Sequence, residues 1–146
     1  MKQNLNRLES VQPLGGAVME IRYTGGQTVR VDFADVAERL AAFAELKDPD
    51  FFQRAVVADW GHTLQWPNGE GLDADRLMEM ALEQAGRTDT LTFRRWQDRN
   101  GLSLAQAADA IGLSRRTVSQ YRTGARHVPR TVTLACKGWE AEQSEA

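Results

Sequence analysis

The stretch from Leu102 to Gly124, LSLAQAADAIGLSRRTVSQYRTG, decides the fold of the C-terminal part of this chain. Apolar side chains recur at helical spacing in its first half, at Leu104, Ala107, Ala108 and Ile111. Gly112 follows where a helix would end, because glycine adopts a left-handed backbone without a Cβ clash. Ser114 can then accept a hydrogen bond from an unpaired backbone N–H. The stretch therefore predicts two helices joined by a tight turn.

The second predicted helix, residues 114–123, has a buried face and an outward face. Val118 and Tyr121 lie three residues apart and form the buried face. The outward residues are Arg115, Arg116, Ser119, Gln120 and Thr123. In the major groove of DNA, arginine can donate two hydrogen bonds to guanine, and glutamine can both donate to and accept from adenine. We therefore expect these five side chains to contact base edges, with Arg116 and Gln120 making the main contacts.

A spaced motif extends beyond these two helices, between Phe93 and Pro129. Its matching positions are Gly101, Leu102, Ser103, Ala108, Gly112, Leu113, Ser114, Val118, Ser119, Tyr121, Gly124 and Pro129. With these residues the stretch resembles the lambda-repressor-like, XRE-type helix-turn-helix domain. The resemblance implies an all-α DNA-binding domain. That family usually packs five helices, whereas this chain has room for about four.

The same resemblance implies contacts with the DNA backbone. Arg126 and Arg130 resemble positions that contact phosphate in the family. The full set of expected phosphate contacts is Ser103, Arg126, Arg130 and Arg94. The chain departs from the family at Leu104, where many members have a glutamine that supports the recognition helix and touches phosphate.

Charge divides the chain after Thr88. Residues 1–88 hold 9 Lys and Arg against 14 Asp and Glu, a net charge of −5, whereas residues 89–146 hold 9 against 6, a net charge of +3. A basic segment can bind the phosphates of the DNA backbone, whereas an acidic segment is repelled by DNA. We therefore expect two domains, 1–88 and 89–146. Residues 87–92 are predicted to form a polar linker, with Thr92 capping the next helix.

The N-terminal half predicts an antiparallel sheet with two helices, so the whole chain belongs to the α+β class. Strands are expected at residues 7–12, 17–23, 28–33, 54–59 and 62–66, from alternation and turn residues. Helical spacing predicts helices over 35–46 and 73–86, capped by Asp35 and Asp73. At the other end, residues 140–146 are predicted to form a frayed acidic tail.

A set of single residues and short motifs is spaced along this half. They are Val11, Pro13, Tyr23, Val31, Leu46-Lys47-Asp48-Pro49 with Phe51 or Phe52, Trp66-Pro67-Asn68-Gly69, Leu72, Asp75 and Leu77. With them, residues 8–80 resemble a family of small bacterial α+β domains of unknown function, some of which carry a C-terminal helix-turn-helix. Gly25 and Gly71 depart from the family, which usually has aspartate near these positions. The resemblance implies no activity, because the family has none assigned.

The sequence predicts no catalytic residue, no metal site and no cofactor. His62 is the best candidate base, yet no nucleophile motif lies near it, and we expect a structural histidine. Trp60 and Trp66 are expected in the core, with a small ligand pocket between them as the alternative. Cys136 is expected to be a buried, reduced thiol. The absence of a membrane span and of a signal peptide predicts a cytoplasmic location.

The sequence favours a sequence-specific DNA-binding transcriptional regulator with a recognition helix at residues 114–123. A homodimer on a palindromic DNA site is expected, because a single small helix-turn-helix covers few base pairs. The alternative is an antitoxin-like protein, or another interaction module, whose acidic N-terminal domain binds a partner protein. Two weaker alternatives are an enzyme that the helix-turn-helix only targets to DNA, and a helix-turn-helix that only packs.

Overall fold

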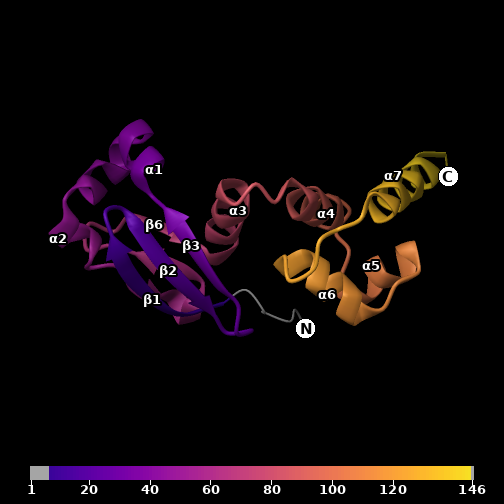
Figure 1. Ribbon diagram of the computed structural model, residues 1–146, viewed down its shortest axis with the longest axis horizontal. Coiled ribbons are helices and arrows are strands. Elements are labelled where there is room, and N and C mark those ends of the chain that lie inside the picture. Colours follow the sequence, from indigo (N-terminus) through magenta and orange to yellow (C-terminus); the bar gives the residue numbers. More distant parts are fainter. Residues whose placement is uncertain (1–6, 146) are drawn as a thin grey trace. The chain divides into compact units, whose positions relative to one another are not determined.

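The computed structural model describes residues 7–145, and the chain divides into two compact units, Met1–Gln84 and Ala85–Ala146 (Figure 1). The strands of the first unit are β1 (Leu8–Gly15), β2 (Val18–Tyr23), β3 (Thr28–Asp32), β4 (Val56–Ala58), β5 (Thr63–Gln65) and β6 (Gly71–Asp73). Its helices are α1 (Ala34–Arg39), α2 (Pro49–Phe52) and α3 (Ala74–Gln84), with 3-10 turns η1 (Ala41–Lys47) and η2 (Asp59–Gly61). The predicted α+β class is confirmed.

The strands of the first unit form two antiparallel sheets, ordered β1-β2-β3 and β4-β5-β6. The alternation predicted for β2 is confirmed, because Met19, Ile21 and Tyr23 are all buried. Met19 pairs with Val31 of β3, and Ile21 pairs with Val29. One face of this sheet is therefore apolar and packed, and the other is exposed.

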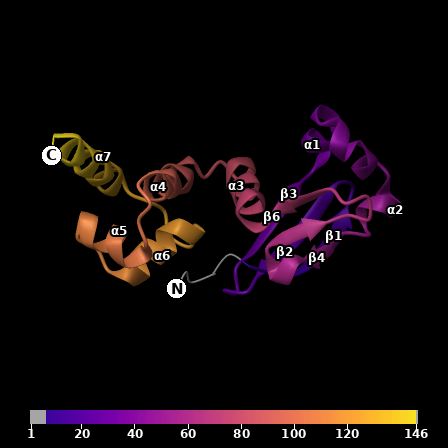
Figure 2. The ribbon, with the colours of Figure 1, turned by 180° about the vertical axis from the view of Figure 1, so that it is seen from behind.

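An aromatic cluster joins the two sheets in the core of this unit. The ring of Trp66 lies 5.6 Å from that of Phe33 and 6.2 Å from that of Phe52, measured between centroids. The Trp66 Nε1–H donates to the Phe52 carbonyl at 3.1 Å, so the buried indole nitrogen is satisfied. Helix α3 packs beside β3, with Leu77 and Met78 fully buried (Figures 1 and 2).

The helix predicted over 35–46 is interrupted. The backbone is extended at Leu40, which separates α1 from η1 and leaves this leucine exposed. The break lets η1 bury Phe43, whose ring packs 6.4 Å from Trp66. Asp35 does not cap α1, because Asp32 accepts the Ala34 N–H instead. For α3 the predicted cap is confirmed, since Asp73 accepts the Arg76 N–H at 2.7 Å.

Trp60 does not lie in the core, although Trp66 does. The predicted burial of Trp60 is therefore wrong, and so is the alternative of a pocket between Trp60 and Trp66. The Trp60 residue is 88% exposed. It lies in the turn η2, where Asp59, Trp60 and Gly61 all have positive φ. Gly61 packs so closely on β1 that a Cβ would lie 2.8 Å from the Leu8 carbonyl oxygen. This turn directs Trp60 outward, and His62 beside it is also exposed rather than buried in the structure.

The second unit consists of four helices in its described part: α4 (Thr88–Arg99), α5 (Leu104–Ile111), α6 (Arg115–Thr123) and α7 (Arg130–Glu145). Helix α4 begins at Thr88, so most of the predicted linker is helical and Thr92 is not its cap. The helix starts before the predicted position because its first turns bury Leu91, and such packing stabilises a helix. The acidic tail is helical through Glu145, because Glu140 pairs with Arg99 at 2.7 Å. Ala146 lies outside the described residues.

These four helices enclose one apolar core. Its buried aromatic members are Phe93, Trp96 and Tyr121. The ring centroid of Phe93 lies 5.5 Å from that of Trp96 and 5.5 Å from that of Tyr121. The predicted burial of Val118 and Tyr121 is confirmed. Cys136 is also buried, as predicted, and burial raises the pKa of its thiol to about 11. Among the described helices of both units, none combines the length and apolar character needed to cross a membrane.

Candidate nucleic-acid interface

The predicted turn between α5 and α6 is confirmed in its details. Gly112 ends α5 with a left-handed backbone, at a φ of 71°. Ser114 caps α6, where its Oγ accepts the Thr117 N–H at 3.1 Å. At the start of α5, the Ser103 Oγ accepts the Gln106 N–H, and the Gln106 side chain accepts the Ser103 N–H. Both helices therefore begin at a serine cap, which fixes their ends on either side of the turn.

The outward face of α6 carries the predicted base-contacting residues. Arg115 and Arg116 are exposed, and Ser119, Gln120 and Thr123 are partly exposed beside them. The Thr123 hydroxyl donates to the Gln120 carbonyl at 3.4 Å, within the last turn of the helix. The helix ends at Gly124, whose φ is 81°.

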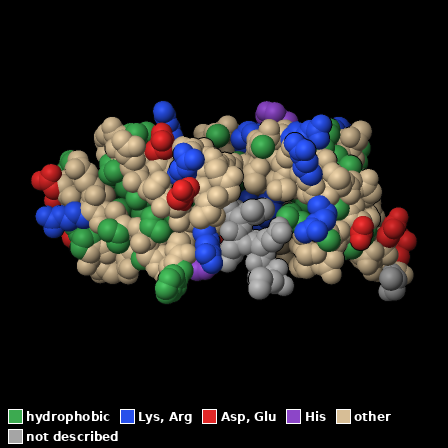
Figure 3. Space-filling model, turned by 90° about the horizontal axis from the view of Figure 1, so that it is seen from below, with side chains coloured by type: hydrophobic (Ala, Val, Ile, Leu, Met, Phe, Trp, Pro, Cys, Tyr) green, Lys and Arg blue, Asp and Glu red, His purple; other side chains and the backbone are tan. Residues whose placement is uncertain are grey.

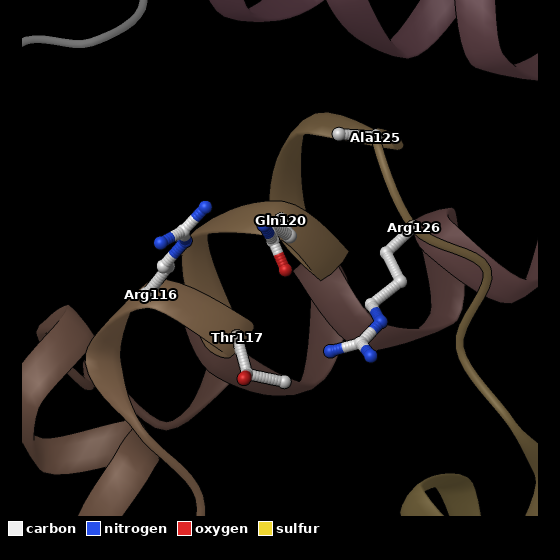
Figure 4. Close-up of a pocket in the computed structure, with 5 residues that line it drawn as sticks. All are labelled: Arg116, Thr117, Gln120, Ala125 and Arg126. Atoms are coloured by element: carbon white, nitrogen blue, oxygen red, sulfur yellow. The ribbon is translucent and has the colours of Figure 1, made fainter.

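A shallow hollow of about 410 Å³ brings α6 together with the loop that follows it. Its lining residues are Arg116, Thr117, Gln120, Ala125 and Arg126 (Figure 4). The Arg126 N–H donates to the Gln120 carbonyl at 3.2 Å, so the loop folds back on the helix. Figure 4 shows Arg116 and Arg126 on either side of Gln120. A predicted base contact and a predicted phosphate contact thus lie next to each other.

Arg94, which the sequence placed among the phosphate contacts, is instead part of the core. The residue is 3% exposed, and its Nη1 donates to the Arg122 carbonyl at 2.8 Å. The prediction that Arg94 contacts phosphate is therefore wrong, because Arg94 lies on the packed face of α4, between the buried Thr90 and Gln97, and faces α6. Two further arginines of this region hold the unit together: Arg122 pairs with Asp98 at 3.0 Å, and Arg99 with Glu140.

Four other arginines of the unit remain open to solvent. They are Arg115, Arg116, Arg126 and Arg130, and none of them forms an ion pair within residues 7–145. In Figure 3 several Lys and Arg side chains are visible on the surface of this unit, as they are on the other unit. Exposed guanidinium groups without carboxylate partners can bind phosphate oxygens and the acceptor atoms of guanine.

The segment assigned to a linker contains two residues that sequence reasoning missed. Arg87 donates to the Gly124 carbonyl at 2.9 Å and pairs with Asp89 at 3.2 Å. Asp89 accepts the Val128 N–H at 2.8 Å. Burial raises the pKa of Asp89, but hydrogen bonds from Arg87, Val128 and Thr90 outweigh that effect and lower it to about 2. The first turn of α4 therefore holds both ends of the loop after α6.

The part of the chain that the structure describes contains no cluster of three His, Cys, Asp or Glu residues able to hold a metal ion. His127 is exposed, and its Nδ1 lies 3.6 Å from Asp89 Oδ2.

Known proteins match both units. Residues 8–83 match the family described as protein of unknown function DUF2442, and this match covers more than half of the chain. The chain belongs to the DUF2442 family. Residues 91–145 match a helix-turn-helix domain. Both predicted resemblances are confirmed at this level: a DUF2442 domain is followed by a helix-turn-helix domain.

A solved structure is similar to this DUF2442 protein over nearly the whole length of the chain. It is a crystal structure from Nitrosomonas europaea, described as that of a candidate DNA-binding protein. The two chains are 37% identical with a TM-score of 0.66, and the match covers 96% of this chain and 90% of the other. No curated protein sequence matches the chain.

Proposed function

We propose that this DUF2442 protein is a sequence-specific DNA-binding transcriptional regulator, in which helix α6 enters the major groove. The observation that carries this proposal is the hollow where Arg116, Gln120 and Arg126 meet. Neither arginine has a carboxylate partner within residues 7–145, and both flank an amide that can donate and accept. Arg116 and Gln120 contact base edges, and Arg126 contacts a phosphate beside them.

The remaining contacts extend this arrangement along α6 and its neighbours. Arg115, Ser119 and Thr123 reach neighbouring base edges from the same helix face. Arg130, at the first turn of α7, and Ser103, the N-cap residue of α5, contact phosphates. The Arg130 guanidinium and the hydroxyl hydrogen of Ser103 are donors that suit phosphate oxygens.

The proposed DNA-bound form is a homodimer on a palindromic site. A single α6 covers only a few base pairs, and two copies whose recognition helices are about 34 Å apart reach successive major grooves. Sedimentation velocity with and without the bound duplex tests this point. Two protein chains on each duplex would support the dimer, whereas one chain on each duplex would contradict it.

A second candidate function is the binding of a protein partner by the DUF2442 domain, as in antitoxin-like regulators. The observation that favours it is Trp60, which is 88% exposed in a turn of positive φ. A large exposed aromatic side chain is typical of the centre of a protein interface. If this function holds, Trp60→Ala removes the partner from the complex and leaves DNA binding by the helix-turn-helix domain unchanged.

Selection of binding sites from a library of random duplexes tests the main proposal. The wild-type protein should enrich one short sequence, and the Arg116→Ala, Gln120→Ala double variant should enrich none. Lys137→Ala, which removes an exposed charge from α7, is the matched control and should enrich the wild-type sequence. Failure of the wild-type protein to enrich any sequence would contradict the proposal.

A further inference from the structure

The loop after α6, residues 124–128, is held from a distant part of the sequence. This loop carries Arg126, the proposed phosphate contact on one side of the hollow. Arg87 lies at the start of α4, more than thirty residues earlier, and it is only partly exposed. Its Nη1 donates to the Gly124 carbonyl at 2.9 Å, and its Nη2 lies 3.5 Å from the Arg126 carbonyl.

The guanidinium of Arg87 is itself fixed in place. It pairs with the Asp89 carboxylate at 3.2 Å, and its Nη2 donates to the Thr90 hydroxyl at 3.0 Å. Asp89 also accepts the Val128 N–H at 2.8 Å, so the pair binds the loop at both ends. The planar guanidinium has five N–H donors in one rigid arrangement, which lets a single side chain make all these contacts.

We propose that Arg87 is a positioning residue for DNA binding, which holds the loop after α6 so that Arg126 reaches a phosphate beside the major groove. This inference rests on the proposed function. Arg87 acts through the backbone of the loop, since its donors are directed at carbonyl oxygens and at Asp89. It is therefore a different kind of contributor from Arg126, whose side chain is free to face the ligand.

A double-mutant cycle on the full-length protein tests the inference. Binding to the selected duplex is measured across a salt series for Arg87→Ala, Arg126→Ala and the double variant. Each single variant should lose roughly tenfold in affinity, the range expected for one charged contact. Each should also lower the slope of log affinity against log salt by about 0.9, the value for one lost phosphate contact.

The double variant should lose no more than either single variant, because both substitutions remove the same phosphate contact. Losses that multiply to about a hundredfold would overturn the inference, as would wild-type affinity in Arg87→Ala. Arg87→Lys should fall between wild type and alanine, since one ammonium cannot satisfy the loop carbonyls and Asp89 together. Lys137→Ala, which also removes one positive charge, is the control and should keep the wild-type salt slope.

Amide hydrogen exchange separates failure of this inference from failure of the proposed function. The N–H groups of Arg126 and Val128 should exchange at least about tenfold faster in Arg87→Ala, while that of Trp96 in α4 keeps its wild-type rate. Unchanged exchange in the loop would overturn the inference whether or not the protein binds DNA. Faster exchange in a protein that binds no duplex would contradict the proposed function, and with it the role of the loop in DNA binding.

Discussion

The guanidinium of Arg94 in α4 donates a hydrogen bond to the backbone carbonyl of Arg122, in the last turn of α6, at 2.8 Å. The last carbonyl groups of a helix lack partners within the helix, so a buried arginine stabilises that end of α6. Arg122 in turn donates to the Gln97 side chain at 3.3 Å, back on α4. The first helix of the unit and the proposed recognition helix are therefore connected by arginines whose donors are directed at the unit itself.

We expect Arg94→Met to destabilise the helix-turn-helix domain by about 2 kcal/mol, because it removes a charged hydrogen bond and leaves a carbonyl without its partner. Denaturation in urea, followed by circular dichroism, measures this loss. The neighbouring exposed Arg95→Met is the control and should cost less. A fully stable Arg94→Met variant with a reduced salt slope of DNA binding would instead restore the phosphate role that the sequence suggested.

The Asp89 carboxylate should make the stability of this domain depend on acid pH. Its pKa in the folded state is about 2, below its usual 3.8, so the ionised form stabilises the fold. The groups that face it are Arg87 and His127. We expect Asp89→Asn to cost on the order of 1 kcal/mol near pH 7, because the amide cannot pair with Arg87 as a carboxylate does.

This difference between wild type and Asp89→Asn should not shrink between pH 7 and about pH 4, and it should disappear as the pH falls through about 2. Unfolding in urea at a series of pH values measures it. Asp109→Asn, in an exposed part of α5, is the control and should show no such trend. A difference that is already lost at pH 4, or that persists undiminished below pH 2, would contradict the assigned role of Asp89.

The Cys136 thiol should be unreactive in the folded protein. Burial raises its pKa to about 11, so little of the reactive thiolate exists near neutral pH, and reagents cannot reach the sulfur. Labelling with a disulfide reagent at pH 8 should be slow without denaturant and fast in guanidinium chloride. Equally fast labelling under both conditions would show that α7 is not packed as described.

The turn between α5 and α6 could be predicted from the sequence, because its signals are local. Gly112 and Ser114 each have a conformational or hydrogen-bonding reason to stand where they do. Val118 and Tyr121 mark the buried face of α6 by their spacing alone. The outward residues of the candidate site follow directly from that face.

The errors concern contacts between residues far apart in sequence. The sequence of Arg87 to Thr92 is polar, as in a linker, yet Leu91 is buried and the helix begins at Thr88. Arg94 lies on the same buried face of α4 as Thr90 and Gln97, and it donates to α6. The prediction that Trp60 is buried rests on the usual burial of large aromatic residues. The turn at Gly61, which packs against Leu8 of β1, directs Trp60 outward instead. None of these outcomes has a signal in the neighbouring residues.

The most direct test of the account is the binding of the purified protein to the DNA upstream of its own gene across a salt series, beside the Arg116→Ala, Gln120→Ala variant. We predict tight binding that weakens steeply with salt. The variant should lose its preference for this DNA, by roughly 1–3 kcal/mol for each contact removed, and keep a weak non-specific affinity. Equal affinity of both proteins for this DNA and for random DNA would contradict the role of α6 in sequence recognition.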